Sequence, residues 1–310
     1  MRVAIIGQQD FGKAVMEAFL NRHDDVAGVF CAPEKPDARP DPLKQAAEER
    51  QLKVFQFPSL KGPEAQSALR ALDVDIGIMA YVLQFAPQDF VTIPKHGMIQ
   101  YHPSLLPAYR GPSSINWPVI LGEQKTGLTI FRPNDGLDEG PVILQKEAVI
   151  GPDDTIGSVY FNQLFPLGVT AMLEAADLVV NGRHQEIVQD EALARYEGWC
   201  RMPEARVDWH HHVDIIYNLI RGCNPAPGAW TTYQGQKVQL FESRKHRFRT
   251  FGAVKGKSGE ISDIGQESIR VTAQGGQIEI FKVKPEGGKK MSAVDFARQS
   301  GLDIGTTLGV

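Results

Sequence analysis

The stretch His96-Gly-Met-Ile-Gln-Tyr-His102 is an apolar run that ends on a histidine, and its pattern predicts a short β-strand. Side chains alternate between the two faces of a strand, so we expect Gln100 and His102 to point the same way and Tyr101 to point the opposite way. A hydrogen-bonding amide and a proton carrier therefore share one face at the end of this strand.

A carboxylate follows 36 positions after the histidine. Asp138 lies in the turn-rich segment Asn134-Asp-Gly-Leu-Asp-Glu-Gly140, between the apolar runs 127–131 and 141–144. Two such runs around a turn predict a hairpin, which can return the carboxylate to the crevice that holds His102. We therefore expect His102 and Asp138 to lie close together.

The first 200 residues alternate between apolar runs and helical stretches. The runs lie at residues 2–6, 26–30, 75–80 and 97–101, and helices are expected near 12–21, 42–50 and 64–72. This alternation is typical of an α/β fold, a Rossmann-like, mostly parallel sheet with helices on both faces. Ligands of such sheets bind beyond the carboxyl ends of the strands, and the loops after Ile6, Ala80 and Tyr101 leave from that edge.

The remainder of the chain has a different pattern. Residues 156–180 predict one long helix, and the segment 203–209 marks a boundary. Short expected strands at 238–241, 269–272 and 277–281, separated by glycine-rich turns, indicate a small OB-like β-barrel. We therefore predict an α/β catalytic domain over residues 1–203 and a barrel domain over residues 204–310.

Composition limits the class of protein. The 310 residues are 42% hydrophobic, which suits a well-buried globular protein. No run of 18 apolar residues occurs, and the N-terminal segment is too short and too quickly polar for a signal peptide, so we expect a cytoplasmic protein without membrane association. Cys31, Cys200 and Cys223 are odd in number and widely spaced, which argues against a disulfide framework and a zinc site and favours neutral thiols.

The net charge of -4 conceals an asymmetry. Residues 205–310 carry 15 Lys and Arg against 10 Asp and Glu, a balance of +5, so residues 1–204 carry 18 against 27, a balance of -9. A basic cluster adds to the positive part, and it could meet nucleic-acid phosphates or form a solvated turn. Its members are Arg244, Lys245, His246, Arg247 and Arg249.

Two motifs fail on inspection. Gly7-Gln-Gln-Asp-Phe-Gly12 follows the first strand, but it lacks the middle glycine that lets a dinucleotide approach the backbone, so nicotinamide binding is not expected. The loop could still hold an anion at the helix N-terminus. His210-His-His212 resembles a metal tract, yet consecutive helical residues point in different directions, so an exposed polar run is favoured over a site.

Longer strings resemble the folate-dependent formyltransferase family over the whole chain. The N-terminal strings are most like the hydrolase domain of 10-formyltetrahydrofolate dehydrogenases, and the ending resembles the C-terminal barrel of methionyl-tRNA formyltransferases. The strings are Tyr101-His-Pro-Ser-Leu-Leu-Pro107, Arg110-Gly111, Ile115-Asn-Trp117, Gly136-Leu-Asp-Glu-Gly140, Leu164-Phe-Pro166, Tyr196-Glu-Gly198, Ile220-Arg-Gly222, Pro227-Gly-Ala-Trp230 and Lys284-Pro-Glu-Gly-Gly-Lys-Lys-Met-Ser-Ala293.

The resemblance implies roles for particular residues. His102 is implied to be the catalytic histidine and Asp138 the essential aspartate, while Gln84, Phe85 and Ala86 are implied to line the folate pocket together with Asp138. Two departures stand out. Gln100 replaces the asparagine of the transferases and the aliphatic residue of the hydrolase domain, and the loop at residues 32–42 is shorter and less basic than the tRNA-gripping loop of methionyl-tRNA formyltransferases.

Formyl transfer requires these residue types by its own chemistry, apart from any resemblance to a family. Moving a formyl group from N10 of a folate to water or an amine passes through a tetrahedral oxyanion, while protons leave the nucleophile and reach the departing nitrogen. His102 can move those protons, the Gln100 amide can serve the oxyanion, and Asp138 can hold the imidazolium, orient the ring or position a water. Arg110 could brace the loop through a buried pair or meet a carboxylate.

We therefore predict an enzyme that takes formyl from 10-formyltetrahydrofolate as cosubstrate, without metal or NAD. Water is the first expected acceptor, giving tetrahydrofolate and formate, and a small amine the second. Methionyl-tRNA is the alternative, because of the basic barrel, although tRNA is disfavoured as a partner. A non-catalytic folate-binding module is the second alternative.

Overall fold

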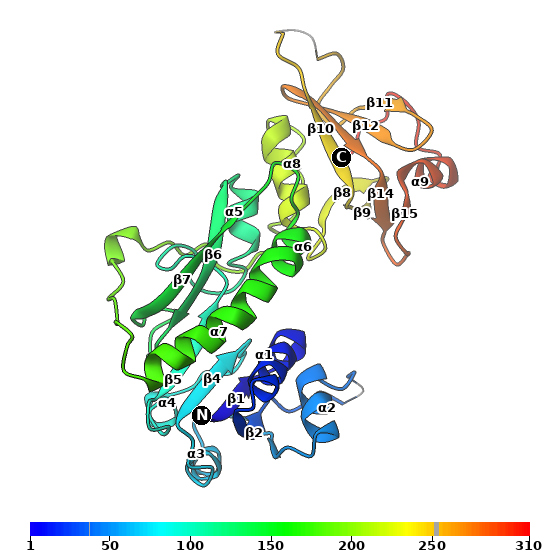
Figure 1. Cartoon of the computed structure of the whole chain (residues 1–310). Helices are drawn as coiled ribbons and strands as arrows, with labels where there is room; N and C mark the ends of the chain where they lie inside the picture. The colour runs from blue at the N-terminus through cyan, green and yellow to red at the C-terminus, as the bar shows by residue number, and fades with distance from the viewer. Residues whose placement is uncertain (37, 251–253) are drawn as a thin grey trace. The chain divides into compact units, whose positions relative to one another are not determined.

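A computed structural model describes residues 1–36, 38–250 and 254–310 of the chain (Figure 1). These residues form two compact units. The first unit consists of residues 1–111, 127–148 and 161–196, and the second of residues 112–126, 149–160 and 197–310. The second unit thus includes residues 112–126, 149–160 and 197–203, which the predicted division at residue 203 assigns to the first domain.

A seven-stranded sheet forms the centre of the first unit, with the order β3-β2-β1-β4-β5-β6-β7. Neighbouring strands from β3 to β5 are parallel, and β6 runs antiparallel to β5. The sheet is therefore mostly parallel, as predicted. Its strands are β1 (Arg2–Gly7), β2 (Asp25–Phe30), β3 (Val54–Phe55), β4 (Ile76–Ala80), β5 (Met98–His102), β6 (Lys125–Phe131) and β7 (Val142–Val149).

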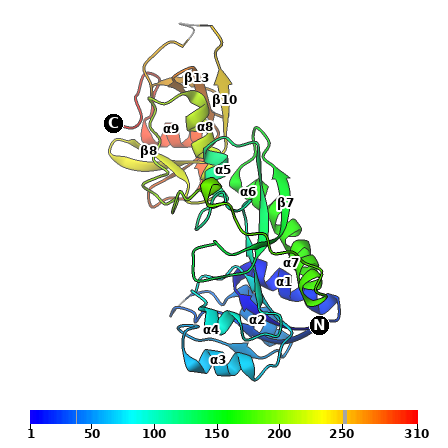
Figure 2. The ribbon, with the colours of Figure 1, turned by 90° about the vertical axis from the view of Figure 1, so that its left-hand side faces the viewer.

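Helices cover both faces of this sheet because strand residues alternate sides. Ile5 packs in a core with α1 (Gln9–Asn21), α2 (Pro42–Glu49) and α7 (Phe165–Val180), whereas Ile6 packs in a second core with α3 (Pro63–Arg70) and α4 (Gln88–Val91). Figure 2 shows α3 and α4 on one side of the unit and α7 on the other. The predicted α/β architecture is confirmed.

The carboxyl ends of β1 and β4 approach each other closely at Gly7. A Cβ atom added to this residue would lie 1.9 Å from the carbonyl oxygen of Ala80, its partner in the pairing. Only glycine fits between the two strands without moving them apart. At the sheet edge where the loops of the predicted site begin, the backbones of β1 and β4 are therefore in direct contact.

The helix expected at residues 156–180 contains an interruption. Residues Ile156–Val159 form α6, residues Tyr160–Leu164 form a π-helical turn (η1), and α7 follows. By length and composition alone, this helix of 25 residues passes the test for a membrane span, a test that core helices of soluble proteins also pass. Within the first unit, Ala171, Met172 and Val179 of α7 are buried against the sheet.

The C-terminal part contains two antiparallel four-stranded sheets, ordered β10-β13-β12-β11 and β15-β14-β9-β8. Side chains of both sheets and of α8 (Val213–Gly222) share one core, including Leu240, Val271 and Ile220. The strands are β8 (Ala229–Tyr233), β9 (Gln236–Leu240), β10 (Ser243–Arg247), β11 (Ile261–Ile264), β12 (Ile269–Ala273), β13 (Gly276–Ile280), β14 (Lys282–Pro285) and β15 (Met291–Ser292). Two helices, α5 (Asn116–Ile120) and α9 (Ala293–Ser300), and the 3-10 turn η2 (Glu191–Leu193) complete the described elements.

Two of the three cysteines are neighbours, which their spacing in sequence did not predict. All three thiols are free and buried, and the Sγ atoms of Cys200 and Cys223 lie 3.8 Å apart. The hydrogen bond between them, followed by burial, raises the pKa of Cys223, and burial raises the pKa of Cys31 to about 12. These two thiols are therefore neutral at physiological pH, as expected.

Candidate active site

His102 is the last residue of β5 and is buried, with 5% of its surface exposed. Gly7 pairs with Ala80, and Met79 pairs with Gln100, so the ends of β1, β4 and β5 meet at one edge of the sheet. Ligands of open α/β sheets bind at such an edge. The predicted strand and the position of His102 at its end are both present.

The hydrogen bonds of His102 define which ring nitrogen is available. Nε2 lies 2.8 Å from the carbonyl oxygen of Tyr109. A carbonyl oxygen can only accept, so Nε2 carries the hydrogen of this bond. Nδ1 lies 3.5 Å from Oδ2 of Asp138 and is the nitrogen that can take up or release a proton.

Asp138 reaches this position from a left-handed backbone conformation, with φ of 56°. Its Oδ2 also accepts a hydrogen bond of 2.8 Å from the backbone amide of Gly111. The same carboxylate oxygen therefore faces both Nδ1 of His102 and the loop that follows β5. The structure brings together the two side chains whose meeting the sequence predicted.

A side chain that the sequence analysis missed braces the Asp138 loop. Gln189 is buried, and its Nε2 donates to the carbonyl oxygens of Asp138 and Gly140, both at 2.8 Å. Its Oε1 accepts from Nε and Nη2 of Arg110, at 3.1 and 2.9 Å. All four hydrogen-bonding positions of this amide are thus in use. No motif marked Gln189, because its partners, two backbone oxygens and the guanidinium of Arg110, are remote in sequence.

Arg110 is bonded to other side chains of the protein, and these bonds hold the loop in place. The guanidinium is 6% exposed, and Nη2 lies 2.6 Å from Oε1 of Glu191 while Nη1 donates to Oε2 at 2.9 Å. The hydrogen bond with Glu191 raises the pKa of Arg110. Of the two roles left open for this residue, the structure shows the ion pair that braces the loop, with a buried guanidinium, an exposed Glu191 and Gln189 as the third member.

Gln100 lies on the same face of β5 as His102. Met98 packs in the core with α3 and α4, whereas Ile99 and Tyr101 pack in the core with α1 and α7. Because side chains alternate along a strand, Gln100 and His102 lie on the same face of β5 as Met98. The amide of Gln100 is half-buried. Within the part of the chain that the structure describes, this amide has no hydrogen-bond partner and is available to a ligand.

The predicted folate loop combines fixed and exposed groups. Nε2 of Gln84 donates to the carbonyl oxygen of Phe57 at 2.8 Å, so this side chain holds the loop in place. Phe85 is half exposed, with Nζ of Lys61 5.0 Å from its ring centre, and Ala86 is buried. Leu83 is also exposed, so the loop after β4 offers apolar surface.

A pocket of about 280 Å³ lies beside Asp138 in the first unit. Leu137 and Tyr196 are half exposed, and the ring of Tyr196 would be 2.3 Å from a Cβ atom added to Gly111. The pocket thus lies next to the loops that carry Asp138 and Gly111. Its lining residues are Arg110, Leu137, Glu139, Ala194, Arg195 and Tyr196.

The histidine tract is a polar surface. His210 and His211 have side chains 85% and 56% exposed and pair with Asp208, while Nδ1 of His212 accepts from the amide of Asp214 at the start of α8. Over residues 1–36, 38–250 and 254–310, no group of three or more His, Cys, Asp or Glu side chains is placed to hold a metal ion.

Family models match most of the chain. The model for formyl transferases matches residues 1–176, and the model for the formyl transferase C-terminal domain matches residues 201–301. The chain belongs to the formyl transferase family, which confirms the resemblance seen in the sequence.

Two relatives differ in how much of them the chain covers. Human mitochondrial 10-formyltetrahydrofolate dehydrogenase is 40% identical over 248 residues, which are 78% of this chain and 27% of that protein. The chain thus spans about a quarter of the length of this relative. Methionyl-tRNA formyltransferase of Geobacter metallireducens is 33% identical over 314 residues, which cover 100% of this chain and 99% of that protein.

Solved structures show the same fold at low sequence identity. HypX from Aquifex aeolicus in complex with tetrahydrofolic acid has a TM-score of 0.71 at 17% identity, over 98% of this chain and 48% of that one. WlaRD, a sugar 3N-formyl transferase, has a TM-score of 0.65 at 15% identity, over 91% of this chain and 97% of that one.

Replacing Gln189 should impair the reaction through Asp138. Gln189→Met keeps the side-chain length but leaves Nε of Arg110 and two carbonyl groups without a partner, while Arg110 keeps Glu191, so we expect a loss of stability of about 1–3 kcal/mol. We also expect turnover of the formyl donor to fall roughly 10-fold or more while folate affinity changes little, because the carboxylate loses its support. Thermal unfolding and steady-state kinetics measure the two effects.

Two further variants separate positioning from packing. Gln56→Met removes a comparable bond, from Nε2 to the carbonyl oxygen of Ala32, outside the site and should retain turnover. Gln189→Glu keeps the acceptor for Arg110 but loses the donors to Asp138 and Gly140, so its turnover should resemble that of Gln189→Met. A destabilised Gln189→Met with unchanged turnover would show that Gln189 serves packing alone.

Proposed function

We propose that this chain is an enzyme that removes the formyl group from 10-formyltetrahydrofolate, with water as the first acceptor and a small amine as the second. The observation that carries the proposal is the contact of 3.5 Å between Nδ1 of His102 and Oδ2 of Asp138, at the edge of the sheet where ligands bind. A buried imidazole beside a carboxylate, in a formyl transferase family member, is suited to proton transfer during formyl transfer.

The proposed reaction assigns one task to each side chain. The acceptor oxygen of water attacks the formyl carbon, the carbonyl becomes an oxyanion, and Nδ1 of His102 accepts the proton of the attacking water. Asp138 stabilises the resulting imidazolium and orients the ring, while the amide of Gln100 donates to the oxyanion. Collapse breaks the bond between the formyl carbon and N10, the proton passes to N10, and formate and tetrahydrofolate leave.

The folate would lie against the loop after β4. Phe85 and Leu83 expose apolar surface there, so apolar contacts from Phe85 and main-chain contacts from Gln84 and Ala86 would suit the flat pteridine ring. We propose Asp138 as a further folate contact. The solved structures that name tetrahydrofolic acid or 5-N-formyl-THF as ligands support a folate as donor.

Two observations favour water or a small amine over tRNA. The loop at residues 32–42, of which Asp37 lies outside the described residues, offers only Lys35 and Arg39 as cations. In the basic cluster, Lys245 and Arg247 both pair with Asp214, at 3.0 and 2.7 Å, which leaves less positive charge for phosphates. The alternative, methionyl-tRNA, is supported by the relative from Geobacter metallireducens, which matches over its full length.

We also propose that β8 to β15 form a small OB-like barrel. The strands change sheets without a long connection, since β13 ends at Ile280 and β14 begins at Lys282. Bonds from the amide of Phe241 to the carbonyl of Lys282 and from that of Phe281 to the carbonyl of Glu242 join the two sheets at this corner. An experimental structure with two separately packed sheets would contradict this.

Loss of either member of the pair should stop catalysis. His102→Ala removes the proton carrier and Asp138→Asn removes the charge that holds the imidazolium, so each should lower turnover by roughly 100-fold or more while folate binding survives. Absorbance of 10-formyltetrahydrofolate measures turnover, and tryptophan fluorescence measures folate binding. Asp135→Asn makes the same change at an exposed position in the same loop and should leave both unchanged. Unaltered turnover in either site variant would overturn the assignment.

The amide of Gln100 should matter more for turnover than for binding. Gln100→Leu removes the donor to the oxyanion, so we expect turnover to fall roughly 100-fold with a much smaller rise of the Michaelis constant. Steady-state kinetics of hydrolysis measure both constants. Equal or faster hydrolysis in the leucine variant would mean that Gln100 orders an amine acceptor or fills space.

The acceptor can be decided by parallel assays at low and moderate salt. We expect loss of formyl from 10-formyltetrahydrofolate to be insensitive to salt and to the combined neutralisation of Arg244, Lys245, Arg247 and Arg249. Rapid formylation of methionyl-tRNA that falls steeply with salt and depends on these four residues would favour the tRNA enzyme, because phosphate contacts release counterions. Folate binding without any turnover would favour the non-catalytic module.

A further inference from the structure

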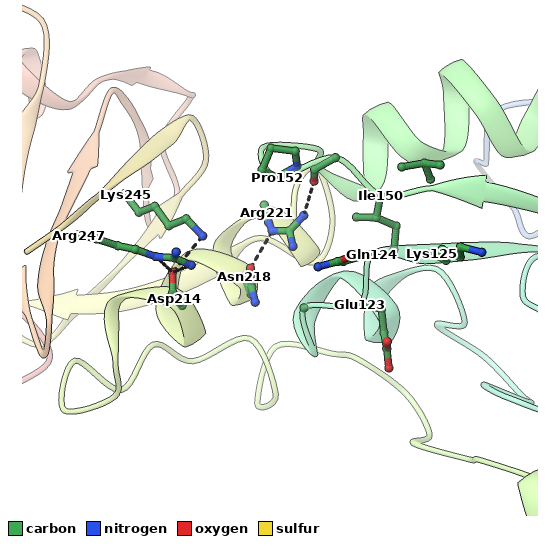
Figure 3. Close-up of a pocket in the computed structure, with 13 residues that line it drawn as sticks. Glu123, Gln124, Lys125, Ile150, Pro152, Asp214, Asn218, Arg221, Lys245 and Arg247 are labelled. Carbon is green, nitrogen blue, oxygen red and sulfur yellow. Dashed lines mark hydrogen bonds and ion pairs between the residues drawn. The ribbon is translucent and has the colours of Figure 1, made fainter. Parts of the chain in front are cut away.

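The second unit contains a pocket of about 570 Å³ that the proposed reaction does not use. This volume lies within the range of small-molecule sites. The pocket is lined by residues 122–125, 149–152, α8 and β10, all within the second unit, as Figure 3 shows. Neither His102 nor Asp138 belongs to it.

Arg221 of α8 is a buried cation without a carboxylate bonded to it. It is 6% exposed; its Nε donates to Oδ1 of Asn218 at 2.9 Å, and its Nη1 donates to the carbonyl oxygens of Gly151 and Asp154, at 3.2 and 3.0 Å. Nη2 has no acceptor among the residues that the structure describes. Arg110 is equally buried yet has Glu191 as its partner.

This difference between the two arginines favours an anion as a ligand of Arg221. Burial lowers the pKa of Arg221, because the charged form loses solvation without gaining a bonded carboxylate. Asp153 and Asp154 lie nearby, but their carboxylates accept from the hydroxyl of Tyr217, from Ser158 and from the amide of Gly151. A buried charge gains most from a bound ion of opposite sign.

Two neutral amides line the pocket beside Arg221. Oδ1 of Asn218 accepts from Arg221, which leaves Nδ2 as a donor. Gln124 is exposed, and its side-chain amide has no hydrogen bond to another described residue. Figure 3 shows Arg221, Asn218 and Gln124 around the same space. Gly122 leaves room for Nδ2 of Asn218, since an added Cβ atom would lie 2.7 Å from it.

The rim of the pocket is more positive than negative. The lining contains Lys125, Arg221, Lys245 and Arg247 against Glu123 and Asp214, a balance of +2. Asp214 pairs with both Lys245 and Arg247, so one carboxylate is shared by two cations. An anion with a charge near -2 would balance the lining.

We propose that this pocket binds the phosphate group of a small phosphomonoester. Nη2 of Arg221 and the amides of Asn218 and Gln124 donate to its oxygens, and Lys245 and Arg247, which share the single charge of Asp214, contribute a net charge of +1. A phosphate offers three terminal oxygens to three donor groups and carries up to two charges, whereas a carboxylate offers two oxygens and one charge. The apolar side chains of Ile150 and Pro152 border the space left for the rest of the ligand.

Calorimetry with the full chain tests the proposal, with inorganic phosphate and pyrophosphate as probes at constant ionic strength. Gln124→Glu and Asn218→Asp each place a carboxylate beside Arg221, so we expect the affinity for both probes to fall about 10-fold or more. The melting temperature should stay equal or rise, because the new carboxylate pairs with the buried guanidinium. Formyl turnover should be unchanged in both variants, which separates this site from the proposed active site.

Gln266→Glu is the matched control, since it makes the same change of charge at an exposed position of the second unit. It should retain the affinity of the wild type within about two-fold. Two outcomes would overturn the proposal: no binding of either probe at about 10 mM, or equal affinities in Gln124→Glu, Asn218→Asp and Gln266→Glu. Binding of an RNA duplex that Gln124→Glu abolishes, without binding of either probe, would overturn it in favour of a nucleic-acid surface.

Discussion

The hydrogen bond from the amide of Gly111 to the carboxylate of Asp138 holds the candidate active site together. It joins the loop that follows β5 to the loop between β6 and β7. Strands β5 and β6 are antiparallel neighbours, with His102 opposite Thr129. This hydrogen bond holds Oδ2 of Asp138, the same oxygen that faces Nδ1 of His102. Gln189 then secures the Asp138 loop from a third segment, so the catalytic geometry depends on three stretches of chain that are distant in sequence.

Local patterns predicted the fold well where burial follows periodicity. The apolar runs at residues 2–6, 75–80 and 97–101 became β1, β4 and β5, because strands in a parallel sheet are buried on both faces. The structure of the basic cluster could not be predicted from periodicity in the same way. Four of its five residues, 244–247, lie in β10 instead of a solvated turn; Lys245 and Arg247 meet Asp214, and His246 between them meets Glu279. These partners lie on other elements, which periodicity cannot reveal.

The same limit applies to the sites. His102 and Asp138 were predictable because their residue types and strand-end positions suit proton transfer. Gln189 was not, because it acts on backbone oxygens, and neither was the approach of Cys200 and Cys223. Arg110 and Arg221 are equally buried and look alike in sequence. Their opposite pKa shifts follow from Glu191, a partner that only the folded chain supplies to one of them.

The left-handed backbone at Asp138 also restricts how the site can be redesigned or can diverge. Asp and Asn enter this region more readily than other side chains, and a β-branched residue there carries a backbone cost of about 1–2 kcal/mol. Glu keeps the charge but lengthens the arm that reaches Gly111. Asparagine is therefore the one substitution at residue 138 that keeps both the length of the side chain and the backbone conformation. A library aimed at a new formyl acceptor is best built by fixing residue 138 and varying Leu137 and Glu139, which line the adjacent pocket.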